Sequence, residues 1–78
     1  MHRYHFPVQN QIFHSNDEEG RDLADLRAAK VEARRAAGEI LIAELAERDR
    51  IEFTVFVEDG EHHRILAIRV HAVCEMLD

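Results

Sequence analysis

Histidines are the residues in this chain whose chemistry is most versatile, because a neutral imidazole binds metals and exchanges protons near neutral pH. His62 and His63 are adjacent, so in an extended strand their side chains point to opposite faces and do not share an ion. His5 and His14 could meet across a first hairpin, but no third ligand accompanies them. The spacing therefore predicts solvated or structural histidines and no metal site. The six are His2, His5, His14, His62, His63 and His71.

The other reactive groups are a lone thiol and an acidic run. Cys74 follows His71 by three positions, which face opposite ways on a strand, so we expect no Cys–His nucleophile. The run Asp17-Glu18-Glu19 offers oxygen atoms to a cation but lacks the alternating ligand positions of a calcium loop. We interpret it as a solvated loop whose charge favours the following helix N-terminus. The sequence predicts no enzyme, no catalytic residue, no metal ligand and no cofactor.

Composition excludes several classes of partner. The chain has 10 Lys and Arg against 16 Asp and Glu, a net charge of −6. Nucleic acids and anionic membrane surfaces would repel such a protein, so we expect neither as a partner. No segment approaches the roughly 20 apolar residues that span a bilayer, and the N-terminus lacks the apolar run of a signal peptide. With a single cysteine, these features predict a cytoplasmic protein.

Size predicts one domain that needs additional stabilisation. A chain of 78 residues forms a single domain, residues 1–78. Domains this small bury only roughly 60% of their unfolded surface, so the core is marginal. One cysteine cannot form a disulfide within the chain. Tight packing or self-association remains to supplement the core.

The first half of the chain predicts two strands and one helix. Residues 4–8 alternate in polarity as a half-buried strand does, and Ile12–His14 predicts a short second strand. Gly20 follows in a polar loop, where it is free to adopt positive φ. Proline-free sequence rich in Ala, Leu, Glu and Arg predicts a helix from Leu26 to about Glu47, with Asp25 favoured over Asp22 as its N-cap. The helix face turned to the sheet is expected to carry Leu26, Ala29, Ala33, Ala36, Ala37 and Ile40.

The second half predicts a hairpin. Residues 51–58 alternate clearly, Asp59-Gly60 is a hairpin turn signal, and the return strand runs from about His63 to Val73. On that return strand the residues facing the helix are expected to be Leu66, Ile68, Val70 and Ala72.

These elements predict an α+β fold of two layers. Its order is β-β-α-β-β, with a mainly antiparallel four-stranded sheet covered on one face by one long helix. The crossover through the helix leaves open a parallel pair between a strand of the first hairpin and one of the second. Because one helix covers only one face, apolar residues on the far sheet face and on the back of the helix suggest a partner. The interface candidates are Phe56, Ile65, Ala67, Val73, Val31 and Ile42.

Several motifs carry a resemblance to a known group of proteins. The opening Arg3-Tyr4-His5-Phe6, the loop Asp17-Glu18-Glu19-Gly20 and the helix entry Leu23-Ala24-Asp25-Leu26-x-Ala28-Ala29 resemble a family of small proteins of unknown function from rhizobia and related alphaproteobacteria. Members start with Met-x-Arg-Tyr-aromatic-Phe, pass an Asp-x-x-Gly loop and enter a helix through Asp-Leu-x-x-Ala. Pro7 departs from the pattern and bears on how the first strand pairs. The resemblance implies no activity. A weaker similarity is to HicB-type antitoxins, and it implies a protein that masks a toxin.

Three functions follow as hypotheses. The first is a non-catalytic protein-interaction module that self-associates, most simply as a homodimer. The second is an antitoxin-like or regulatory subunit that binds another protein through the same surface. The third, a metal-dependent enzyme, has the least support in the sequence.

Overall fold

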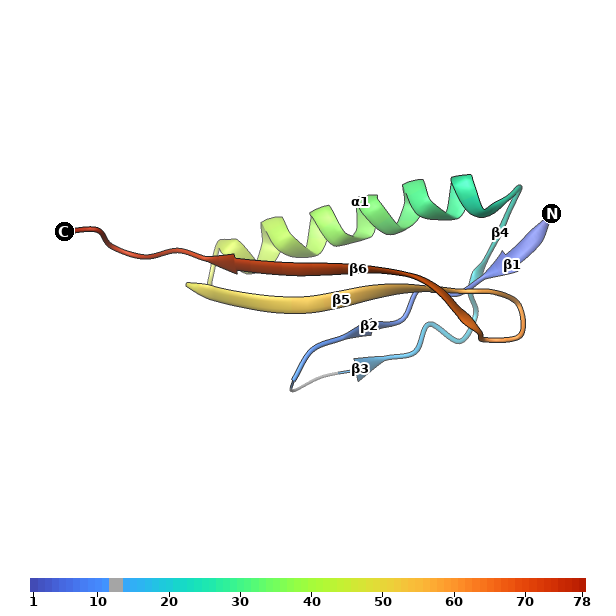
Figure 1. The fold of residues 1–78 in the computed structure, drawn as a ribbon, viewed down its shortest axis with the longest axis horizontal. Coiled ribbons are helices and arrows are strands. Elements are labelled where there is room, and N and C mark those ends of the chain that lie inside the picture. Colours follow the sequence, from blue (N-terminus) through green and yellow to red (C-terminus); the bar gives the residue numbers. More distant parts are fainter. Residues whose placement is uncertain (12–13) are drawn as a thin grey trace.

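The described residues of the chain fold into one long helix and six strands, of which the last two are the longest. The computed structural model describes residues 1–11 and 14–78, and its principal extents are 52 × 22 × 16 Å (Figure 1). The elements in chain order are β1 (His2–Tyr4), β2 (Val8–Gln9), β3 (His14–Ser15), β4 (Arg21–Leu23), α1 (Leu26–Leu45), β5 (Arg50–Glu58) and β6 (Arg64–Val73).

The strands form two sheets rather than one. A four-stranded sheet has the order β3-β2-β5-β6, and β1 pairs separately with β4. The predicted α+β class with one helix and antiparallel pairing is confirmed, whereas the single-sheet β-β-α-β-β arrangement is wrong. Every pairing between the described strands is antiparallel, so the parallel pair left open by the sequence does not occur among them. Figure 1 shows the reason. Helix α1 runs in the same direction as β2, so β5, which follows the helix, runs back antiparallel to β2.

Pro7 explains why the predicted first strand is interrupted. Pro7 has no N–H to donate, and its carbonyl accepts the N–H of Phe56 at 2.9 Å. On one side His5 forms an isolated bridge with Glu58, and on the other Val8 pairs with Val55. Of the predicted second strand Ile12–His14, His14 lies in β3, while residues 12 and 13 lie outside the described part of the chain.

Helix α1 starts where the sequence predicts. The Asp25 carboxylate accepts the N–H of Ala28 at 2.9 Å, which confirms Asp25 as the N-cap. The helix ends at Leu45, two residues before the predicted Glu47. Leu26, which the periodicity places on the sheet-facing side, is exposed at the first turn.

Small side chains let the helix lie close to the sheet. The helix buries Ala29, Ala33 and Ala37, and the β5 residues on the same face of the sheet fill the space between the layers. The core therefore lies between α1 and β5. Those buried β5 residues are Ile51, Phe53, Val55 and Val57.

The hairpin between β5 and β6 has the predicted location but a different turn. Asp59 accepts the N–H of His62 at its carbonyl, and its carboxylate accepts the N–H groups of Glu61 and His63, all at 2.9 Å. His62, with φ of 64°, is the left-handed residue, and Gly60 is not. The predicted hairpin at Asp59-Gly60 is confirmed. Its loop is longer than a two-residue turn, because Asp59 closes it and the left-handed residue is His62. As a result β6 begins at Arg64 rather than His63.

Candidate functional site

The outer edge of β6 is the longest unpaired backbone on the four-stranded sheet. β6 is 10 residues long and pairs with β5 alone among the strands that the structure describes. The opposite edge strand, β3, has only 2 residues. Natural sheets protect their edges with short strands, proline, inward-pointing charge or a covering element. β3 is protected by its shortness. β6 has one register irregularity near its start, opposite Val57 and Glu58, and two arginines, Arg64 and Arg69, but neither proline nor lysine.

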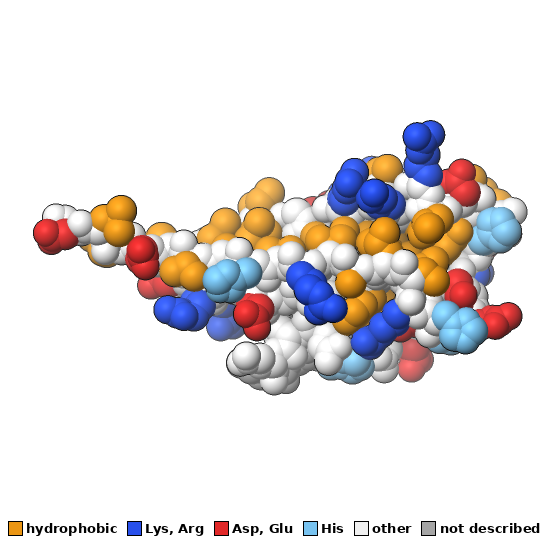
Figure 2. Space-filling view, in the orientation of Figure 1, with side chains coloured by type: hydrophobic (Ala, Val, Ile, Leu, Met, Phe, Trp, Pro, Cys, Tyr) orange, Lys and Arg blue, Asp and Glu red, His pale blue; other side chains and the backbone are white. Residues whose placement is uncertain are grey.

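The helix-facing side chains of β6 are only partly covered. On β5, Val55 and Val57 are fully buried, whereas Leu66, Ile68 and Val70 of β6 are half-buried. Helix α1 therefore covers β5 and leaves the outer side of the β6 row in contact with solvent. In Figure 2 hydrophobic side chains gather in a band along the boundary between α1 and β6. The sequence assigned this row to the core, because alternation does not distinguish an edge strand from a central one.

The open face of the sheet is less apolar than the sequence suggests. Phe56 is half-buried, and the guanidinium of Arg64 lies 3.9 Å from the centroid of its ring. That cation–π contact covers part of the predicted apolar face. Ile65 and Val73 are exposed at opposite ends of β6, about 26 Å apart at the usual strand rise. Ala67 lies two residues from Ile65 on the same face and directly opposite Phe56, so only Val73 is remote from the others.

The candidates on the back of α1 are isolated from each other. Val31 is 52% exposed and Ile42 is 73% exposed. They are about 16 Å apart along the helix at 1.5 Å per residue. Scattered apolar residues of this kind are normal on protein surfaces. The structure therefore brings Phe56, Ala67 and Ile65 together on the open face of the β5–β6 hairpin. It leaves the other three candidates, Val73, Val31 and Ile42, apart from them.

A pair of stacked histidines lies beneath the β5–β6 turn. The rings of His5 and His62 stack with centroids 4.2 Å apart, and His5 is only 5% exposed. Nδ1 of His5 lies 2.9 Å from the carbonyl oxygen of Asp17, so this nitrogen carries the proton and donates. Nδ1 of His62 lies 3.0 Å from the Glu58 carboxylate. His5 and His14, which the sequence allowed to meet across a first hairpin, pair with different residues: His14 with Gln9, and His5 with Glu58.

Asp17 and Gly20 hold this cluster in place from the acidic loop. Besides accepting from His5 at its carbonyl, Asp17 accepts the backbone N–H of Phe6 at its carboxylate, at 2.8 Å. Gly20 has φ of 68°, and a Cβ there would lie 2.5 Å from the carbonyl oxygen of Tyr4. The acidic loop thus anchors the N-terminal segment. The sequence did not indicate this role, because it depends on contacts between segments distant in the chain.

The reactive groups of the described residues do not gather into a metal site. No group of three His, Cys, Asp or Glu residues within residues 1–11 and 14–78 could hold a metal ion. Cys74 is exposed at the end of β6. No helix in the described part of the chain is long and apolar enough to cross a membrane.

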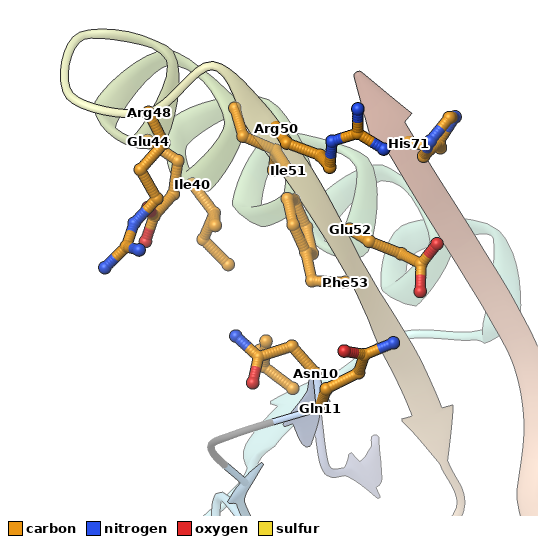
Figure 3. A pocket seen from close by; sticks show the side chains of 11 residues that line it. Asn10, Gln11, Ile40, Glu44, Arg48, Arg50, Ile51, Glu52, Phe53 and His71 are labelled. Carbon is orange, nitrogen blue, oxygen red and sulfur yellow. The ribbon is translucent and has the colours of Figure 1, made fainter. Parts of the chain in front are cut away.

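A hollow of about 660 Å³ lies beside the free portion of β5. In Figure 3 Ile40 and Glu44 of α1 lie on one side of β5, while Glu52 and His71 lie on the other. The hollow therefore wraps around an unpaired strand edge and does not gather polar groups at one point. It has mixed charge, including an ion pair between Arg48 and Glu44 at 2.7 Å.

Comparison with known proteins identifies one family. A family profile described as a domain of unknown function, DUF6894, matches residues 3–71. No curated protein and no solved structure matches the chain.

Proposed function

The chain belongs to the DUF6894 family of domains of unknown function, and we propose that it is a non-catalytic protein-interaction module that self-associates. The observation that carries the proposal is the half-covered apolar row of β6 beside an unpaired strand edge. Burying that row against a partner would remove apolar surface from water at about 25 cal/mol per Å². Pairing the edge would also satisfy its backbone groups. A cytoplasmic location is part of the proposal and rests on the single cysteine.

Light scattering on the eluate of a sizing column tests self-association. At micromolar concentration we expect a mass of two chains, that is twice 9.1 kDa. A mass of one chain throughout the peak would contradict the proposal. The Ile42→Lys variant is a matched control, because Ile42 lies on the back of α1, away from β6, and should leave the dimer intact.

The antitoxin-like alternative uses the same edge with a different occupant. An extended segment of another protein can add to a free strand edge as readily as a second copy can. A folded monomer at all concentrations, together with a stable complex formed with a purified partner, would favour this alternative. The metal-dependent enzyme hypothesis would require bound metal, and less than about 0.1 ion per chain after purification without a histidine tag would end it.

A further inference from the structure

We infer that β6 pairs antiparallel with β6 of a second copy, about a two-fold axis that passes at Ile68. The two four-stranded sheets would then form one continuous sheet, with both helices on the same face. The inference rests on the proposed self-association and specifies its surface and register.

The ladder with β5 determines which β6 groups are free to pair. The N–H of Cys74 donates to the carbonyl of Asp49 at 2.7 Å, one position beyond the pair Arg50–Val73 at the open end of the hairpin. Hydrogen-bonded and non-hydrogen-bonded pairs alternate along an antiparallel ladder. By that alternation Leu66, Ile68 and Val70 direct their backbone groups to β5. The residues between them, Ala67, Arg69 and His71, direct theirs outward.

A two-fold axis must place outward-facing residues opposite one another, which leaves few registers. Axes at Ile68 and Arg69 retain the most overlap between the two strands. An axis at Arg69 sets that residue opposite the partner's Arg69, and like charges directly opposite are destabilising. An axis at Ile68 sets Arg69 opposite the partner's Ala67. Side-chain charge therefore favours Ile68.

The same register closes the gap that α1 leaves. On the helix-facing side Ile68 meets the partner's Ile68, and Leu66 meets the partner's Val70. Leu66, Ile68 and Val70 are each half-buried in the single chain. With strands about 4.8 Å apart and each helix over its own β5, the helix axes would be about 14 Å apart. Packed helices approach to about 8–10 Å, so the helices do not collide and the apolar pairs lie between them.

The other two free edges of the four-stranded sheet, on β3 and on part of β5, are less suited to pairing with a second copy. β3 has only 2 residues, His14 and Ser15. The free part of β5 extends from Arg50 to Phe53, because β2 pairs only with Thr54 and Val55. That stretch alternates an arginine and a glutamate on the open face, beside the ion pair of Arg48 with Glu44. On the helix side of that stretch, Ile51 and Phe53 are already buried, so neither edge offers the half-covered apolar row that β6 has.

Single cysteines at candidate axis positions test the register directly. In a Cys74→Ser background, Ile68→Cys, Arg69→Cys and Val70→Cys are oxidised with glutathione disulfide and examined on a denaturing gel without reductant. A residue on the axis in a non-hydrogen-bonded pair lies about 4.5 Å from its copy between Cα atoms, within reach of a disulfide. We expect Ile68→Cys to form the covalent dimer at least tenfold faster than the other two. Faster cross-linking at Arg69→Cys or Val70→Cys would overturn the inference.

An edge-blocking variant tests the surface independently of the register. Ala67→Pro removes an outward N–H without removing a bond to β5, so it blocks pairing on the free side. We expect this variant to elute as a folded monomer, judged by an unchanged far-ultraviolet circular dichroism spectrum, while Ile42→Lys remains a dimer. If the wild type is a dimer and Ala67→Pro stays one, the inference fails while self-association stands. If the wild type is a monomer, both fail.

Discussion

Two glycine-to-alanine substitutions should change stability in opposite directions, and Gly20→Ala is the informative one. Gly20 has φ of 68°, and a Cβ added there would lie 2.5 Å from the carbonyl oxygen of Tyr4 and 2.8 Å from Nδ1 of His5. Neither neighbour can rotate away, since one is backbone and the other is held by Asp17 and stacked on His62. The substitution must therefore move the backbone or displace His5.

The expected cost follows from these contacts. A left-handed conformation costs a non-glycine residue about 1–2 kcal/mol. Displacing His5 from the Asp17 carbonyl adds about 1 kcal/mol for the hydrogen bond. We expect Gly20→Ala to lower the free energy of unfolding by about 2–3 kcal/mol, a large fraction of the roughly 5–15 kcal/mol typical of a whole domain.

Gly38→Ala is the matched control, because it makes the same glycine-to-alanine change at a position where the added methyl group has room. Gly38 lies within α1, and a Cβ there meets nothing within 4 Å. We expect stabilisation by about 0.5–1 kcal/mol from helix propensity alone. Urea titration followed by circular dichroism, at one protein concentration for all variants, measures both effects. A Gly20→Ala midpoint equal to that of the wild type, or a Gly38→Ala midpoint below it, would refute the reasoning.

Three further predictions concern a cap, a stack and a turn. Asp25→Ala should lower the free energy of unfolding by about 1 kcal/mol, because it removes the N-cap of α1. Asp22→Ala loses only an exposed ion pair with Arg3 and should cost less than about 0.5 kcal/mol in the same urea titration, so equal effects would refute the cap assignment. His62→Ala should lower the free energy of unfolding by about 1–2 kcal/mol, because it removes the ring stack with His5 and the bond to Glu58. His63→Ala, at an exposed residue, should lower it by less than about 0.5 kcal/mol. A thermal unfolding series in which His63→Ala is the less stable variant would contradict this prediction. The N–H groups of His63 and Glu61 hold the pKa of Asp59 below its usual 3.8, so the charged carboxylate adds stability that is present above pH 3.8 and is lost as pH falls through the lower, folded-state pKa. Asp59→Asn should therefore reduce the loss of unfolding free energy, measured by urea titration, as the pH is lowered through the acid range. An unchanged dependence on pH would count against the turn geometry.

Local patterns predicted the helix and the long hairpin well. Asp25, Ala29, Ala33 and Ala37 could be assigned because capping and helical periodicity depend on neighbours within a few residues. The strong alternation of residues 51–58 likewise identified β5.

The N-terminal half resisted prediction because distant contacts determine it. Pro7 is buried with its carbonyl bonded to Phe56, and His5 stacks on His62 from the far end of the sequence. Asp17 adopts φ of 48° to bond both His5 and Phe6, which no local signal indicates. These contacts divide the predicted first strand between two sheets, while its end in β2 still pairs with β3 as a hairpin.

The candidate surface was predicted only in general terms. The sequence indicated that one helix leaves apolar residues uncovered, but it placed them on the open sheet face and the back of α1. In the structure Arg64 covers part of Phe56, and Val31 and Ile42 are far apart. The half-covered row is instead on the helix side of β6, because strand order, which a single sequence does not encode locally, makes β6 an edge.

Sedimentation equilibrium of the unmodified chain tests the central claim, self-association, most directly. Across a concentration range from below to above about 10 µM, we expect the average mass to rise from that of one 9.1 kDa chain toward that of two, or to remain at two throughout. A mass of one chain at every concentration would contradict the account.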